Sequence, residues 1–418
     1  MSATEESYDV AIVGAGIAGC TAARLYAQQG LRIALIDRRG HIGDHKRMCT
    51  HFIQPSATPI IQRLGLAPLI EQAGGIRNRL DTWTRWGWIR VPEPDDGSNP
   101  PYGYSIRRET LDPILRNLAA ETPGVELMMA TQVTQLTRSE KRVAGVVVRG
   151  RDGEQRELGA RLVVGADGRD SAVGAMAGVR ARAMANNRFT YFAYYRDLEL
   201  TSGQAGQAWL LEPDFAIAYP NDDGVSLVGC FVERSKLPEF KRDLDGSFTR
   251  MIDALPMAPK IHEAERVSPL LGKLDMPNTT RRLAVPGLAF IGDAAMSGDP
   301  LWAIGCGWAF QSAAWLADRT THALLRDHDR VDRALSRYRR THRKKLLAFY
   351  LQSSDFSSAR KLLPHERLLL ASAAKDPIMA RRFTAFGEGL IGVHKVISPR
   401  SLGRATRVVL TERFSRKS

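Results

Sequence analysis

Three glycines near the start of the chain are spaced as Gly-x-Gly-x-x-Gly. Gly14, Gly16 and Gly19 stand between an apolar run at 8–13 and a predicted helix. In such a loop the first glycine allows a tight turn, the second lets the backbone approach a pyrophosphate, and the third lets the helix pack on the sheet. The free amides at the start of the helix face the phosphates. Asp37 ends the next apolar run, where an acid can bind ribose hydroxyls, so we expect a dinucleotide site here.

Two acidic turns later in the chain also follow apolar runs. The first, Asp167-Gly168, comes after RLVVGA, and the second, Gly292-Asp293, comes after LAFI. Pro300 and a series of small residues then lead from the second turn into a predicted helix. Either turn alone is consistent with an ordinary strand end. An acid, a proline and spaced glycines before a helix indicate a binding loop.

The segments around these motifs predict a parallel sheet. The runs at 8–13 and 31–37 are expected to be buried strands separated by a helix, which is the start of a βαβ unit. In TLDPILRNLAAETPG, Leu111, Leu115 and Leu118 recur at helical spacing and predict an amphipathic helix. Helix is also expected over most of residues 308–350.

The pattern changes between about 186 and 275 to long, aromatic, strand-like segments with turn residues at PNDDG. We therefore predict an α/β fold: a Rossmann-like domain with a parallel sheet, an inserted β-sheet domain and a helical C-terminal region. The expected boundaries are 1–80, 105–185 and 276–335 for the discontinuous first domain, 81–104 and 186–275 for the inserted domain, and 336–418 for the C-terminal region.

The charge of the chain is concentrated at its C-terminal end. Residues 331–418 hold 20 Lys or Arg and 6 Asp or Glu, which accounts for the whole net charge of +14. These cations follow no known nucleic-acid-binding motif, so we expect no nucleic-acid partner. A solvated basic face is the simpler interpretation. The alternative is an anionic partner, either an acidic carrier protein or a membrane surface.

The sequence also bears on the cellular compartment. No long uncharged apolar run suits a membrane span, and the polar start MSATEESYDV is not a secretory leader. The cysteines Cys20, Cys49, Cys230 and Cys306 are far apart in the sequence. This spacing argues against a zinc site and against a disulfide scaffold. We therefore expect no metal and a reducing, cytoplasmic compartment.

The order and separation of the three motifs resemble those of the flavoprotein monooxygenases of the para-hydroxybenzoate hydroxylase fold. The resemblance covers residues 8 to about 340, and SIRRETLDPIL adds the family's Arg-x-x-Leu pattern at Arg108 and Leu111. It implies FAD as cofactor, NAD(P)H as co-substrate and an inserted domain that binds the substrate. It further implies hydroxylation or epoxidation by dioxygen through a flavin C4a-hydroperoxide in a water-poor pocket.

The resemblance also assigns cofactor contacts. Asp37 is expected at the adenosine ribose, Asp293 at the ribityl chain, and the amides of Gly305 and Cys306 at the N1–O2 edge of the flavin. The full set of expected cofactor-binding residues is Gly14, Gly16, Ala18, Gly19, Asp37, Arg38, Arg47, Arg108, Val133, Asp167, Gly168, Gly292, Asp293, Pro300, Gly305 and Cys306.

Two residues are candidates for a catalytic role. His51, in MCTHFIQP, is a candidate acid or base because histidine titrates near neutrality; the alternative is a structural hydrogen bond. Trp302 stands two positions after Pro300, where the family usually has a small residue. It either shapes the flavin pocket or packs under the following helix.

The resemblance, together with the aromatic residues of the chain, implies a small apolar substrate, aromatic or polycyclic and typical of secondary metabolism. Because aromatics on a sheet usually serve the core, only some are expected to touch the substrate. The candidates are Trp83, Trp86, Trp88, Tyr102, Tyr104, Phe189, Tyr191, Phe192, Tyr194 and Tyr195.

Four other functions fit the same motifs. The first is a flavin-dependent halogenase: WGWIRVP is similar to the Trp-x-Trp-x-Ile-Pro motif of halogenases, but it lies before the Asp-Gly turn rather than after it. Lys46 is the one lysine before Lys141 that could supply the lysine halogenases require. The second is a reductase of isoprenoid double bonds, and the third is an oxygenase fed by a separate flavin reductase. The fourth is an FAD-bearing scaffold without turnover.

Overall fold

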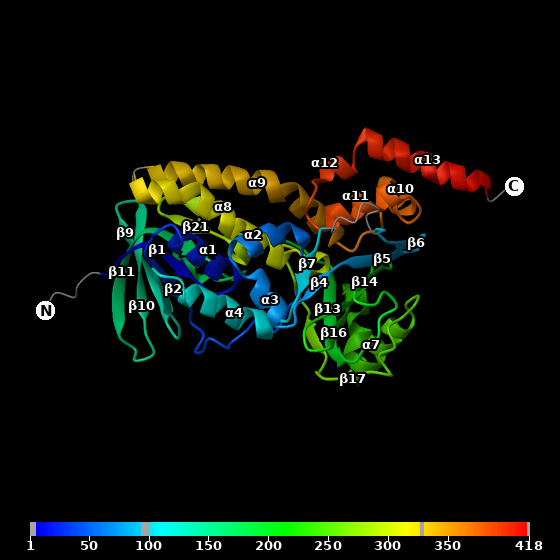
Figure 1. The fold of residues 1–418 in the computed structure, drawn as a ribbon, viewed down its shortest axis with the longest axis horizontal. Helices are drawn as coiled ribbons and strands as arrows, with labels where there is room; N and C mark the ends of the chain where they lie inside the picture. The colour runs from blue at the N-terminus through cyan, green and yellow to red at the C-terminus, as the bar shows by residue number, and fades with distance from the viewer. Residues whose placement is uncertain (1–5, 93–100, 327–329, 416–418) are drawn as a thin grey trace.

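The computed structural model of the chain describes residues 6–92, 101–326 and 330–415. Two eight-stranded sheets form its two halves (Figure 1). The long helices α8 (Gly305–Arg326) and α9 (Val331–Phe356) run along one edge of the molecule. Among the described residues, no helix is both long and apolar enough to cross a bilayer.

The first sheet is mainly parallel, with the strand order β20-β21-β11-β1-β2-β8 and β20 antiparallel at the edge. Two more strands, β9 and β10, extend β11 as antiparallel partners. Helix α1 (Ile17–Ala27) packs between β1 and α8. The strands are β1 (Glu6–Val13), β2 (Ile33–Ile36), β8 (Val125–Met128), β9 (Gln132–Ser139), β10 (Arg142–Arg149), β11 (Gln155–Gly165), β20 (Ala284–Val285) and β21 (Leu288–Phe290). The predicted α/β fold with a parallel sheet is confirmed.

The second sheet has the order β17-β13-β16-β15-β14-β5-β6, with β18 paired to β13. Parallel pairing of β5 with β14 joins the strand at 80–84 to the later segment as one sheet. Helices α6 (Leu237–Arg242) and α7 (Leu244–Asp253) cover one face. The strands are β5 (Leu80–Thr84), β6 (Gly87–Ile89), β13 (Arg188–Arg196), β14 (Gly206–Leu210), β15 (Phe215–Pro220), β16 (Val225–Glu233), β17 (Glu265–Arg266) and β18 (Leu271–Lys273).

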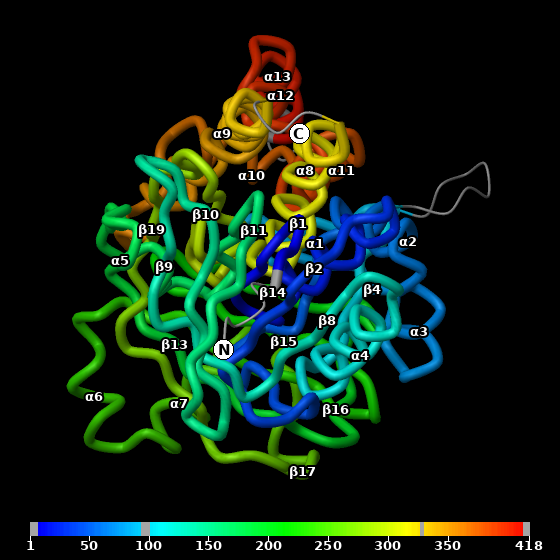
Figure 2. Tube along the Cα trace, turned by 90° about the vertical axis from the view of Figure 1, so that its left-hand side faces the viewer, coloured from blue at the N-terminus to red at the C-terminus, as the bar shows by residue number. Residues whose placement is uncertain are grey.

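The C-terminal helices pack on the other face of the second sheet. They are α10 (Pro364–Ala373), α11 (Pro377–Gly387), α12 (Val393–Val396) and α13 (Pro399–Ser415). Both views place α13 at the top of the molecule, beyond α9, with α7 at the opposite side (Figures 1 and 2).

Smaller elements complete the fold around the two large sheets. They are the strands β3 (Phe52–Ile53), β4 (Ile76–Asn78), β7 (Gly103–Ser105), β12 (Arg182–Met184), β19 (Asn278–Thr280) and β22 (Met296–Ser297), and the helices α2 (Thr58–Arg63), α3 (Ala67–Gln72), α4 (Arg108–Ala120) and α5 (Ala172–Met176). The predicted amphipathic helix corresponds to α4, which buries Leu111 and Leu115.

Helix α9 contributes to the cores of both halves. Near its start, Leu335 and Tyr338 belong to the core of the first sheet, and the Tyr338 hydroxyl donates to the carbonyl of Phe290 (2.7 Å). Near its end, Phe356 packs with the second sheet and the C-terminal helices. The boundary expected between 335 and 336 therefore falls inside a continuous helix. Hydrophobic periodicity marks the apolar face of a helix but not the point where that face passes from one core to another.

Candidate functional site

The Gly-x-Gly-x-x-Gly loop joins β1 to α1 as predicted. A Cβ on Gly19 would lie 1.8 Å from the carbonyl oxygen of Gly14, and one on Gly14 would lie 2.5 Å from that of Ala166. Gly14 also has a φ of +109°, which side chains disfavour. A Cβ on Gly16 would meet nothing within 4 Å. Gly14 and Gly19 thus allow close packing of the backbone. Gly16 leaves open space at the start of α1, as a pyrophosphate requires.

Asp37 lies at the end of β2, against the same loop. Its buried carboxylate accepts the Ala15 amide (2.6 Å) and pairs with Arg39 (3.1 Å). Arg39 thus lies beside the acid, whereas the side chain of Arg38, one of the expected cofactor-binding residues, is exposed and its contact stays a prediction. The Thr131 amide donates to the Asp37 carbonyl (3.0 Å), which brings the start of β9 to this edge.

Val133, the residue expected to contact adenine, lies two positions further along β9. It pairs with Val148 of β10, and its side chain is buried. The ribose and adenine residues predicted from distant parts of the sequence are thus brought to one edge of the sheet. The adenine contact itself stays a prediction.

Arg116 is a residue of this site that the sequence analysis missed. It is fully buried on α4, and its guanidinium donates to the carbonyls of Ala15 (3.0 Å) and Ile42 (2.6 Å). Its Nη2 has no partner among the described residues. A buried guanidinium with a free N–H beside the glycine loop suits a phosphate oxygen. The spacing of Arg108, Asp112 and Arg116 on one face of a predicted apolar helix was the available signal.

The second acidic turn lies next to the same loop. Gly292 has a φ of +58°, and a Cβ there would lie 2.9 Å from the Cβ of Ala18 on α1. Asp293 pairs with Lys46 (3.2 Å). Burial alone would raise the pKa of Asp293, but the Lys46 ammonium outweighs it and holds that pKa below its usual value. Gly305 opens α8 directly beside Asp293. The N-terminus of α8 thus lies next to this carboxylate.

The first acidic turn has a visible structural role. Asp167 accepts the Ser171 hydroxyl (2.6 Å) and the Val173 amide (3.0 Å), which fastens the start of α5. Gly168 has a φ of +89° and open space around it. The role of Asp167 in cofactor or reductant binding stays a prediction.

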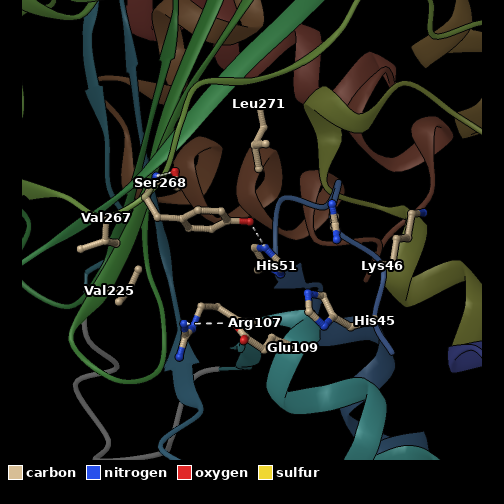
Figure 3. A pocket seen from close by; sticks show the side chains of 11 residues that line it. His45, Lys46, His51, Arg107, Glu109, Val225, Val267, Ser268 and Leu271 are labelled. Carbon is tan, nitrogen blue, oxygen red and sulfur yellow. Dashed lines mark hydrogen bonds and ion pairs between the residues drawn. The ribbon is translucent and has the colours of Figure 1, made fainter. Parts of the chain in front are cut away.

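A cavity of about 250 Å³ opens between the cofactor motifs and the second sheet (Figure 3). Its lining is largely charged and polar on the side of the first sheet and apolar on the side of the second. Of the ten aromatic candidates, Tyr194 is the one found in this lining. The lining residues are His45, Lys46, Arg47, His51, Arg107, Glu109, Tyr194, Val225, Val267, Ser268 and Leu271.

The aromatic side chains of β13 divide between two faces because successive residues of a strand point to opposite sides. Phe192 and Tyr194 face the C-terminal helices and the cavity, whereas Phe189, Tyr191 and Tyr195 pack under α6 and α7. Tyr194 is therefore the one aromatic candidate that lies in the described lining of the cavity.

His51 and Tyr194 form a hydrogen-bonded pair at the cavity. His51 Nδ1 accepts the Arg108 amide (3.0 Å), and Nε2 lies 2.5 Å from the Tyr194 hydroxyl (Figure 3). Burial lowers the pKa of His51, so the ring is neutral near pH 7. Because Nδ1 accepts, the single ring hydrogen is on Nε2 and donates to Tyr194. The hydroxyl hydrogen of Tyr194 is then free to point elsewhere, including into the cavity.

Trp302 ends the short turn that begins at Pro300. Its carbonyl accepts the side-chain amide of Gln54 (2.8 Å), and its ring contacts Phe349 and Phe356 of α9. It is absent from the described lining of the 250 Å³ cavity. Its ring thus packs against α9, and it lines a second, apolar cavity between the second sheet and the C-terminal helices. An effect of Trp302 on the flavin pocket stays a prediction.

Two cysteines also meet at the site. The thiols of Cys49 and Cys306 lie 3.8 Å apart, and the His51 amide donates to Cys49 (3.3 Å). Cys306 is the second residue of α8. The wide spacing of these cysteines in the sequence did not indicate this contact, because sequence separation says nothing about contact across a fold.

These features fit FAD. The open space at Gly16, the free Nη2 of Arg116 and the acid at the end of β2 suit the pyrophosphate and ribose. Asp293 and the start of α8 lie together, as the contacts expected for the flavin require, and those contacts stay predictions. A family model described as an FAD binding domain matches residues 7–344.

The chain belongs to this FAD-binding family. Family membership confirms the FAD-dependent fold that the motifs predicted. A digeranylgeranylglycerophospholipid reductase from Methanosarcina mazei is 28% identical over 313 residues, which are 71% of this chain and 71% of the relative.

Two solved structures share the fold of this family member. One is the myxobacterial FAD-dependent halogenase CndH, with a TM-score of 0.73, 21% identity and coverage of 92% of this chain and 99% of the other. The second is PqsL of Pseudomonas aeruginosa, described as a probable FAD-dependent monooxygenase, with a TM-score of 0.70, 19% identity and coverage of 90% and 99%. At this identity the likeness shows the fold alone.

The halogenase-like segment of this family member lies away from the cavity. Trp88 contacts Trp209 and donates to the sulfur of Met257. Neither Trp86 nor Trp88 belongs to the cavity lining among the described residues. Lys46 does line the cavity, and its ammonium pairs with Asp293.

Proposed function

We propose that the protein is an FAD-dependent reductase that adds hydrogen across carbon–carbon double bonds of an isoprenoid chain. The observation that carries this proposal is the His51–Tyr194 pair, which presents a phenol hydrogen at the cavity. The name of the Methanosarcina mazei relative supports the same reaction class.

Reduction of a double bond needs a hydride and a proton. Bound reduced FAD supplies the hydride. Tyr194 can supply the proton, because its own hydroxyl hydrogen is not used by His51. Burial raises the pKa of Tyr194, so the group is a neutral phenol over the physiological range. His51 is a positioning residue that holds the tyrosine oxygen.

The lining of the cavity suits an amphipathic substrate. Val225, Val267 and Leu271 give an apolar wall, while His45 and Arg47 carry cationic or titratable groups at the other side. Neither His45 nor Arg47 has an ion-pair partner within the described parts of the chain. An apolar chain with an anionic, phosphate-like head fits this division better than a polycyclic aromatic compound.

The monooxygenase reaction is the second candidate. The apolar wall of Val225, Val267 and Leu271 would also suit an apolar molecule to be hydroxylated. The charged groups on the opposite side of the cavity attract water, whereas hydroxylation through a flavin hydroperoxide needs a water-poor pocket.

One experiment separates the two reactions. The FAD-loaded protein is reduced without oxygen by dithionite, NADPH or NADH and is given geranylgeranyl diphosphate or digeranylgeranylglyceryl phosphate. Products that gain one H₂ for each double bond, in the absence of air, support the reductase. Products that gain one oxygen atom, only after air is admitted, would establish the monooxygenase instead.

A further inference from the structure

We infer that the exposed faces of α9 and α13 form a docking surface for an anionic lipid membrane. The inference does not depend on the reaction at the flavin site. It starts from the basic C-terminal region, which the proposed function leaves unexplained.

The exposed face of α9 carries a row of unpaired cations. Arg333, Arg337, Arg340 and Lys344 are exposed and are spaced by four, three and four residues, which puts them on one side of the helix. None of them forms an ion pair with another described residue. Residues 333–351 contain seven Arg or Lys and no Asp or Glu. The face is therefore cationic without internal neutralisation.

The same face ends in an exposed aliphatic side chain. Leu351 follows Lys344 by two helical turns and is 49% exposed. Helix α13 repeats the arrangement, with exposed Arg400 and Arg407 followed by Leu410, which is 46% exposed. Across the described residues, nine large apolar side chains are exposed, and six of them fall between 325 and 410. Cations and exposed aliphatic groups thus gather in the same part of the chain.

The two helices share one side of the molecule. Both views show α9 and α13 along the top, with α7 at the opposite side (Figures 1 and 2). The ion pair of Arg404 with Asp376 (2.6 Å) fixes α13 to the start of α11. The surface is therefore held in place by the fold.

This combination favours a lipid surface over an acidic protein or a nucleic acid. Cations are attracted to anionic headgroups, while neighbouring leucines enter the acyl boundary. A nucleic acid would leave the leucines unused. The end of α9, together with α10, α11 and α12, lines the second cavity, which is mostly apolar and extends to Trp302. An apolar cavity beside the end of α9 suits the acyl part of a lipid.

The test is sedimentation of the FAD-loaded protein with vesicles. We expect binding to vesicles of equal phosphatidylglycerol and phosphatidylcholine at moderate salt, weaker binding as salt is added, and little binding to phosphatidylcholine alone. The triple variant Arg337→Glu, Arg340→Glu and Lys344→Glu should lower the partition coefficient by at least roughly a hundredfold, since each lost cation near an anionic surface costs about 1 kcal/mol and the new carboxylates add repulsion. Leu351→Gln combined with Leu410→Gln should weaken binding at high salt as well.

The matched control reverses the same amount of charge elsewhere. Lys241, Arg242 and Lys273 are exposed residues of α6 and β18, and their replacement by Glu should leave binding within a few-fold of wild type. Retained FAD and an unchanged circular dichroism spectrum show that the variants are folded.

Two results would overturn the inference. One is equal loss of binding in the two triple variants, which would indicate a net-charge effect without a defined surface. The other is a wild-type protein that does not sediment with anionic vesicles but is retained by immobilised acyl carrier protein. That result would assign the surface to an acidic protein.

Discussion

The thiols of Cys49 and Cys306 lie 3.8 Å apart although 257 residues separate them in the chain. A hydrogen bond from Cys306 holds the pKa of Cys49 well below its usual value and raises that of Cys306. Lys46 and Arg108 favour the Cys49 thiolate further. Cys49 is therefore the thiol of the pair that loses its proton at the lower pH, and Cys306 keeps its proton.

Alkylation should be fastest at Cys49, because the thiolate is the reactive form. The rate for Cys49 should level off at a lower pH than for an ordinary thiol, and Cys306→Ala, which removes the hydrogen-bond donor, should move that profile to higher pH. Cys20 and Cys230 serve as internal controls, since burial raises the pKa of each to about 12. Mass spectrometry after iodoacetamide pulses measures the four rates. A Cys49 profile like that of a free thiol would contradict the assignment.

Tyr194→Phe should lower the rate of double-bond reduction by about a hundredfold, which is typical for the loss of a general acid. FAD content should stay unchanged, because the side chain is placed on the substrate side of the cavity. Tyr195→Phe is the matched control. It alters the next residue of β13, which packs on the opposite face of the sheet. Equal rates in the two variants would exclude Tyr194 as the proton donor.

Gly16→Ala and Gly19→Ala should separate cofactor binding from folding. A Cβ at position 16 meets nothing, so the apoprotein should keep its melting temperature and lose FAD affinity by at least about tenfold. A Cβ at position 19 would lie 1.8 Å from the Gly14 carbonyl oxygen, so that variant should fail to fold. Calorimetry and FAD titration measure the two effects. A Gly16→Ala protein that binds FAD normally would place the pyrophosphate elsewhere.

His342 should make the fold sensitive to acid. Burial against Trp315 and Tyr338 lowers its pKa to about 4. Between about pH 6.5 and 4 the unfolded chain binds more protons than the folded chain, so stability is complete above this window and falls as pH decreases through it. The shift corresponds to about 3 kcal/mol at the acid end.

His342→Phe should remove this pH dependence while preserving stability at neutral pH. Its ring can keep the contacts with Trp315 and Tyr338, and Nδ1 has no hydrogen-bond partner among the described residues. His394→Gln changes an exposed histidine and should behave as wild type. Urea unfolding at several pH values checks the prediction. An unchanged slope in His342→Phe would assign the acid sensitivity to other groups.

The local part of the site could be predicted from the sequence. The glycine loop, Asp37 and Gly292-Asp293 are each defined by residues within a few positions of a strand end, where spacing reflects local backbone geometry. Helix α4 followed from periodicity in the same way. The parallel character of the first sheet, though not its strand order, followed from the βαβ pattern.

The rest depended on contacts between distant segments. Arg116 is recognisable as a phosphate ligand only when α4 lies against the β1–α1 loop. Tyr194 could not be distinguished from nine other aromatic residues until the pleat of β13 placed it at His51. The meeting of Cys49 and Cys306 likewise required the closed fold.

The continuity of α9 has a mechanical consequence. One helix of 26 residues is anchored in the first core by Tyr338 and in the second by Phe356. It contains no proline or glycine at which it could bend freely. Rotation of one half relative to the other would therefore have to bend α9 or break its packing. A displacement of one end of α9 is expected to move the other end. Hydrogen exchange along α9 should slow over its whole length when FAD binds.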